Sequence, residues 1–128
     1  MRRQITALAG ALLTLAVAAC GSVNAVTNPY LGVPKYPRSD PDKVQILRSE
    51  PATPHDRLGE IVLDAPLDSP AKQPLLEETL QIEASRLGAD AVVIVFDRIV
   101  QTSPYDSARR IVGLAIRSKP PAAEQPAR

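Results

Sequence analysis

Prolines limit where this chain of 128 residues can form regular structure. Proline lacks an amide donor and is confined to the ends of helices and the edges of sheets. Seven of the 13 prolines lie in two flanks, at positions 29, 34, 37, 41, 120, 121 and 126. The sequence therefore predicts one small domain over 42–118, between a proline-rich tether over 20–41 and a disordered tail over 119–128.

The amino terminus has the layout of a secretory leader. Arg2 and Arg3 precede an apolar run over 5–17, which is short for a transmembrane helix. Small residues follow, and then comes Cys20, the only cysteine of the chain. Residues 1–19 resemble a bacterial lipoprotein signal with its lipobox, in which a peptidase cleaves between Ala19 and Cys20.

This resemblance implies that Cys20 becomes the lipidated first residue of the mature protein. In such lipoproteins the thiol takes a diacylglyceryl group and the freed amine is acylated, so that chains such as palmitate anchor the protein. Residue 22 is Ser, and not the Asp that retains this class at the inner membrane. We expect the periplasmic face of the outer membrane; an ordinary cleaved leader with a chance cysteine is the alternative.

The charge balance argues against a nucleic-acid partner. The chain has 15 basic and 14 acidic residues, and loss of Arg2 and Arg3 with the leader leaves 13 against 14. A protein that grips phosphates needs clustered Lys and Arg, and here the charges are interspersed. A single cysteine also excludes an intramolecular disulfide.

Hydrophobic patterning predicts an α+β domain, with one amphipathic helix on a four-stranded sheet. The helix carries an apolar stripe and should end at Gly88, which suits a left-handed cap. Ser85 should face water, and Glu83 should pair with Arg86 at the rim of the stripe. The predicted elements are strands over 43–48 and 58–63, a helix over 74–87 with its stripe at Leu76, Leu80, Ala84 and Leu87, and strands over 91–100 and 110–117.

The apolar run over 91–96 has more apolar side chains than one helix can cover. In a regular strand Val93 and Val95 point to one face, whereas Val92, Ile94 and Phe96 point to the other. One face of the sheet therefore lacks a cover, so either the tether folds back over it or it binds another copy or a partner. The candidate interaction surface comprises Val92, Ile94 and Phe96, together with Tyr30 and Tyr36 of the tether.

A family resemblance lies in the helix and the strand that follows it. The stretch over 80–93, with its Gly88-Ala89-Asp90-Ala91-Val92 junction, resembles the outer-membrane stress-sensing lipoproteins of the Rcs phosphorelay. It is also similar to a small family of heavy-metal-binding domains. The chain lacks the cysteines for the two disulfides of the stress sensor, and with one histidine and no free thiol we predict no metal site and no cofactor.

The residues give little support to catalysis. His55 beside Asp56 suggests a base and its orienting group, but both lie in a proline-flanked segment without a strained nucleophile turn, so we interpret them as solvated turn residues. Gly113 inside a strand indicates a bulge or a close approach. The sequence thus predicts a non-enzymatic, lipid-anchored protein that binds or senses an envelope component; the alternative is a self-assembling ring or dimer formed through the uncovered sheet face.

Overall fold

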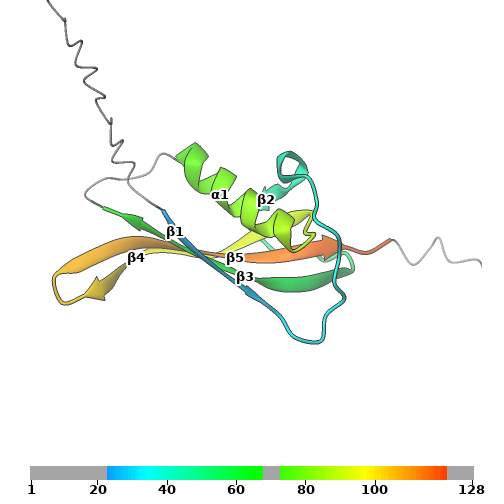
Figure 1. The fold of residues 1–128 in the computed structure, drawn as a ribbon, viewed down its shortest axis with the longest axis horizontal. Coiled ribbons are helices and arrows are strands. Elements are labelled where there is room, and N and C mark those ends of the chain that lie inside the picture. The colour runs from blue at the N-terminus through cyan, green and yellow to red at the C-terminus, as the bar shows by residue number, and fades with distance from the viewer. Residues whose placement is uncertain (1–22, 68–72, 121–128) are drawn as a thin grey trace, which may run out of the picture.

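A computed structural model of the chain describes residues 23–67 and 73–120. The leader, Cys20 and the far end of the tail lie outside these residues. The described part is an α+β domain in which one helix lies along one face of a five-stranded sheet (Figure 1). The elements are β1 (Asn24–Pro29), the 3-10 turn η1 (Pro41–Lys43), β2 (Gln45–Leu47), β3 (His55–Pro66), α1 (Gln73–Arg86), β4 (Ala91–Ser103) and β5 (Asp106–Ser118).

The sheet has the strand order β1-β3-β5-β4-β2. All neighbouring pairs are antiparallel except β2 and β4, which run parallel. The four predicted strands are present, and β3, β4 and β5 extend well beyond their predicted ends because they pair with one another along nearly their whole length. The predicted class is confirmed, and the predicted number of strands is wrong by one.

The fifth strand, β1, lies in the segment that was expected to be a tether. It pairs with β3 from Asn24 opposite Asp64 to Pro29 opposite Gly59. Proline fits here because β1 is an edge strand and Pro29 is its last residue. The folded domain therefore includes residues from Val23 onward and does not begin at Asp42.

The rest of the expected tether also packs on the domain. The hydroxyl of Tyr36 donates to Asp56 at 2.6 Å, and the hydroxyl of Ser39 donates to the carbonyl of Ala89. At the other end, the Lys119 amide donates to the Pro54 carbonyl at 2.9 Å, so the first residue of the expected tail is also bound to the domain.

The helix has the predicted apolar stripe and the predicted end. Leu76, Leu80 and Ala84 are buried against the sheet. Gly88 has a φ of 78°, and its amide donates to the Ser85 carbonyl at 3.0 Å, which is the predicted left-handed cap. Ser85 is fully buried and not solvated as predicted, because the segment over 36–39 packs against this end of the helix and the Ser39 amide bonds its carbonyl.

The main core lies between α1 and the sheet. The stripe of α1 packs on Ile61, Leu63, Val92, Ile111 and Ala115, which all point to the helix side. Gly113 lies directly beneath the helix, where an added Cβ would come 2.5 Å from Val92 Cγ1 and 3.2 Å from Leu80 Cδ2. Of the two explanations offered for this glycine, the close approach is confirmed.

A smaller core lies on the opposite face of the sheet. Ala91, Val93, Leu114 and Ile116 are buried there with Leu47 packed against them. β2 and β3 lie on opposite sides of the β5–β4 pair, and the connection over 48–54 crosses this face, where Pro51 and Thr53 line a hollow with Ala91 and Ile116. This crossing segment covers one half of the face, whereas the tether, which was one of the two covers considered, runs past the end of α1. We call the uncovered half the open face.

Candidate functional site

A bulge in β4 determines which side chains reach the open face. The β4–β5 register shifts between Ile94 and Phe96, so Val95 is the extra residue. Phe96 then pairs with Val112, whose neighbour Ile111 points to the helix, and Phe96 must therefore point away from the helix. The prediction that Phe96 shares a face with Val92 and Ile94 is wrong, because a regular period of two does not hold across a bulge.

The bulge completes a row of apolar side chains that crosses four strands. Val26 pairs with Val62, Val62 with Val112, and Val112 with Phe96. Val26 is 50% exposed and Phe96 is 37% exposed, and the two valines between them are half-buried. We call these four residues the apolar row; Val95, 58% exposed, lies beside it.

Charged residues border the apolar row on the side of the β4–β5 turn. Asp64 accepts two hydrogen bonds from Arg110, both at 2.8 Å. The Arg110 guanidinium holds the pKa of the Asp64 carboxyl below its usual range. Arg98 stands opposite Arg110 on β4, and it makes no ion pair within the described residues. This border is polar and solvated, and the Asp64–Arg110 pair is fixed in place by its two hydrogen bonds.

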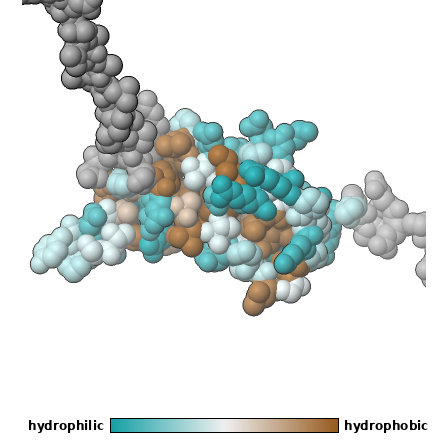
Figure 2. Space-filling view, in the orientation of Figure 1, coloured by the Kyte–Doolittle hydropathy of each residue, from teal (hydrophilic) through white to brown (hydrophobic). Residues whose placement is uncertain are grey.

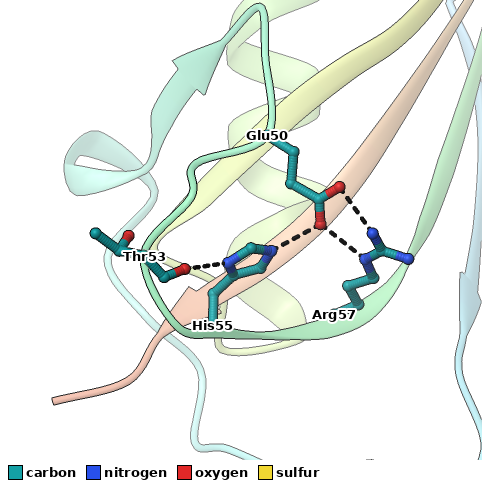
Figure 3. Close-up of polar contacts among 4 residues, drawn as sticks. All are labelled: Glu50, Thr53, His55 and Arg57. Atoms are coloured by element: carbon teal, nitrogen blue, oxygen red, sulfur yellow. Dashed lines mark hydrogen bonds and ion pairs between the residues drawn. The ribbon is translucent and has the colours of Figure 1, made fainter. Parts of the chain in front are cut away.

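A second charged cluster borders the row on the side of the crossing segment (Figure 3). Glu50 accepts hydrogen bonds from Arg57 at 2.7 and 2.8 Å, and lies 2.7 Å from Nε2 of His55. Nδ1 of His55 lies 2.6 Å from the Thr53 carbonyl oxygen. A carbonyl and a carboxylate can only accept, so both ring nitrogens have reason to carry protons and the imidazolium form fits the site.

The pKa values follow from these contacts. The Glu50 carboxylate raises the pKa of His55, and the Thr53 carbonyl acts in the same direction. Arg57, followed by His55, lowers the pKa of Glu50 to about 2. The cluster thus fixes the crossing segment over the sheet. His55 is 13% exposed and is part of an ion-pair network, so its interpretation as a solvated turn residue is wrong.

A shallow hollow joins this cluster to the apolar row. It has a volume of about 290 Å³ and is lined by Tyr30, Glu50, Arg57, Glu60, Val95 and Leu114. Tyr30, 39% exposed, thus lies at the margin of the open face as part of the same surface.

Comparison with known proteins bears on the fold alone. No protein-family model and no curated protein matches the sequence. Among solved structures, the chain is similar to the crystal structure of a Francisella virulence factor, FvfA, with a TM-score of 0.51 and 13% sequence identity. The similarity covers 73% of this chain and 97% of that chain. The two proteins share a fold.

Three other predicted surface residues do not reach the open face. Val92 is fully buried beneath α1, and Ile94 packs against the same core, so neither belongs to an exposed surface. Tyr36 is half-buried on the helix side of the sheet, where the Arg117 guanidinium lies 4.2 Å from its ring centroid. Its hydrogen bond to Asp56 raises the pKa of the Tyr36 hydroxyl.

Sequence reasoning missed Val26, Val62 and Val112. Val62 and Val112 each alternate with core residues within predicted strands, so period-two patterning contained a signal for them. Val26 was missed because β1 was not predicted. Asp56, which was considered as an orienting group for His55, instead binds Tyr36 and Lys119.

Two further observations limit the chemistry of the described residues. Within residues 23–67 and 73–120, no group of three or more His, Cys, Asp or Glu side chains is arranged to hold a metal ion. In the same ranges, the helices are too short or too polar to span a bilayer. The open face is thus best described as an apolar strip between two fixed charged borders.

Proposed function

We propose that this chain is a lipid-anchored, non-enzymatic protein of the bacterial cell envelope, which binds another envelope protein through the open face. The observation that carries the binding proposal is the apolar row with its charged borders. Protein interfaces commonly have an apolar centre with an aromatic anchor and a polar rim. Phe96 would be the anchor, and the ion pairs of Asp64 and Glu50 would form the rim.

The anchor is supported by the order of residues at the amino terminus. Arg2 and Arg3, the apolar run over 5–17, Ala19 and Cys20 follow one another as in lipoprotein signals. The folded domain then starts at Asn24, shortly after Cys20. The resemblance of residues 80–93 to the Rcs stress-sensing lipoproteins supports an envelope role.

The geometry of the only histidine favours binding over catalysis. Both ring nitrogens of His55 contact oxygen atoms of the protein itself, Glu50 Oε1 and the Thr53 carbonyl. A histidine held in this way stabilises the crossing segment and has no free nitrogen to offer a substrate.

Site-specific photocrosslinking in cells tests the binding surface. A photoreactive amino acid at position 96 should give one dominant adduct with an envelope protein. Leu31 is 98% exposed and apolar and lies in the turn after β1, outside the apolar row, so the same probe at position 31 is the matched control. Equal adduct patterns from positions 96 and 31 would contradict the proposed surface. An adduct from position 96 that persists unchanged after Val112→Glu substitution would contradict it as well.

Self-assembly is the second candidate function, because part of the outer edge of β4 is unpaired within the described part of the chain. β2 pairs only with Ala91, Val92 and Val93, so the outer edge of β4 from Ile94 onward has no partner strand among the described residues. Open edges of this kind pair readily with other strands. An adduct from position 96 with twice the mass of the monomer would favour self-assembly over a different partner.

A further inference from the structure

The folded start of the domain restricts how far it can lie from its anchor, if Cys20 is lipidated as proposed. β1 begins at Asn24, four residues after Cys20. A fully extended chain spans at most about 3.6 Å per residue, so the Cα atoms of Cys20 and Asn24 lie at most about 14 Å apart. The proline-rich segment gives no additional reach, because it is folded onto the domain.

The same geometry determines which end of the domain faces the lipid. Asn24 pairs with Asp64, which is in register with Arg110 and Arg98. The β4–β5 hairpin continues past this row to its turn at residues 104–105, on the side of the domain where β1 starts (Figure 1). The five steps along the strand from Arg98 to Ser103 span roughly 17 Å at about 3.3 Å each.

The hairpin therefore reaches farther than the link to the anchor. If the strands stand upright on the membrane with the hairpin downward, the turn reaches the lipid, because the hairpin is longer than the greatest distance that the link allows between Asn24 and Cys20. If they lie flat, the hairpin lies along the surface. In either arrangement the hairpin end is brought to the lipid, and in the upright one the opposite end, which holds the crossing segment, is directed away from it.

The side chains at this end suit the headgroup layer. Tyr105 in the turn is fully exposed, Ile99 is 66% exposed, and Leu67 and Leu75 are each more than 40% exposed. Arg109 donates to Gln73 at 3.1 Å, which ties the start of α1 to the hairpin. The hairpin surface is pale in Figure 2, which means intermediate hydropathy. Tyrosine is enriched at this depth of a membrane.

We propose that the β4–β5 hairpin end, with Tyr105 at its tip, rests in the headgroup layer of the membrane that holds the Cys20 acyl chains and seats the domain in one orientation. This inference rests on the proposed lipidation of Cys20. The occupant of this surface is the lipid itself, and the open face remains available to a protein.

Fluorescence in vesicles tests the proposal. The full-length lipidated protein is reconstituted into vesicles of phosphatidylethanolamine and phosphatidylglycerol. An environment-sensitive fluorophore is attached to Tyr105→Cys, or to Leu31→Cys as the control. The two positions are 100% and 98% exposed, but Leu31 lies beyond the opposite end of β1. The label at position 105 should shift to shorter wavelength and be quenched by nitroxide lipids, and the label at 31 should behave as in buffer.

Two outcomes would overturn the proposal, and they are distinguishable. If the protein floats with the vesicles but the labels at 105 and 31 are equally unquenched, the hairpin does not touch the lipid. If the parent protein is labelled at its own thiol, Cys20 is not lipidated, and both the anchor and the seating on the membrane are refuted. Circular dichroism of both variants checks that they are folded.

Discussion

At the scale of single residues, Gly113 shows how closely the helix packs on the sheet. A methyl group there would meet Val92 and Leu80 in the centre of the main core. We expect Gly113→Ala to lower the free energy of unfolding by about 1–3 kcal/mol, as overpacking of a core does.

Chemical denaturation of the Gly113 variant against the wild type measures this cost. Thr102→Ala, an exposed substitution on β4, is the control and should change the free energy of unfolding by less than about 0.5 kcal/mol. Equal stability of Gly113→Ala and wild type would mean that the helix lies farther from the sheet than described.

The cluster around Glu50 makes stability depend on pH in two directions. The folded pKa of His55 is raised above its ordinary value of 6.5, so its contribution is complete below that value and is lost as pH rises through the folded pKa. The pKa of Glu50 falls from 4.5 to about 2, so its contribution is complete above 4.5 and is lost as pH falls toward 2. Both contributions are complete between about pH 4.5 and 6.5.

His55→Gln separates the two effects. The difference in free energy of unfolding between wild type and His55→Gln should be largest below pH 6.5 and should shrink as pH rises through the folded pKa of His55. Denaturant unfolding over a pH series measures it. A difference that grows with pH would mean that His55 is neutral in the folded protein.

At the scale of elements, sequence patterning correctly predicted the features that depend on residues close together in the sequence. The helix, its cap at Gly88 and the Glu83–Arg86 pair at 2.8 Å are as predicted, because they depend on residues at most four positions apart. β1 was not predicted because it is a short edge strand that turns only Ala25, Thr27 and Pro29 to the helix side, and because the prolines at 29, 34, 37 and 41 indicated a tether.

The open face could be predicted only in part, because its composition depends on pairing between residues far apart in the sequence. That one face would lack a helix followed from counting elements, and Phe96 and Tyr30, which were predicted to belong to an interaction surface, are exposed. The bulge at Val95 and the crossing segment depend on long-range pairing, which reversed the assignment of Val92 and Ile94. The Glu50 cluster likewise joins residues whose contact follows only from the sheet order.

Removal of β1 tests whether the proline-rich segment is structural. A fragment starting at Asp42 loses the β1–β3 ladder and the hydrogen bond from Tyr36 to Asp56. At about 1 kcal/mol for each hydrogen bond, we expect it to be less stable than a fragment starting at Val23 by more than about 3 kcal/mol. Thermal unfolding compares the two fragments, and equal midpoints would show that β1 adds nothing to the domain.

At the scale of the whole molecule, the short link would hold the domain close to the membrane if Cys20 is lipidated as proposed. The apolar row lies two residues along β1 from Asn24, so a partner on the open face must itself reach close to the lipid. This favours a partner that is also bound to the membrane.

Lengthening the link should uncouple anchoring from seating. Twenty Gly and Ser residues inserted between Ser22 and Val23 would span about 25 Å on average, which exceeds the reach of the hairpin. We expect the protein to stay on the membrane while the fluorophore at position 105 becomes less quenched by nitroxide lipids. Unchanged quenching would mean that the hairpin binds lipid by its own affinity.

The anchored state itself is the claim on which the rest depends. Mass spectrometry of the protein extracted from membranes should find a mature chain that starts at Cys20, with a diacylglyceryl thioether on its sulfur and an acyl group on its amine. A chain that starts at Cys20 with a free thiol, or one that still carries residues 1–19, would contradict the account.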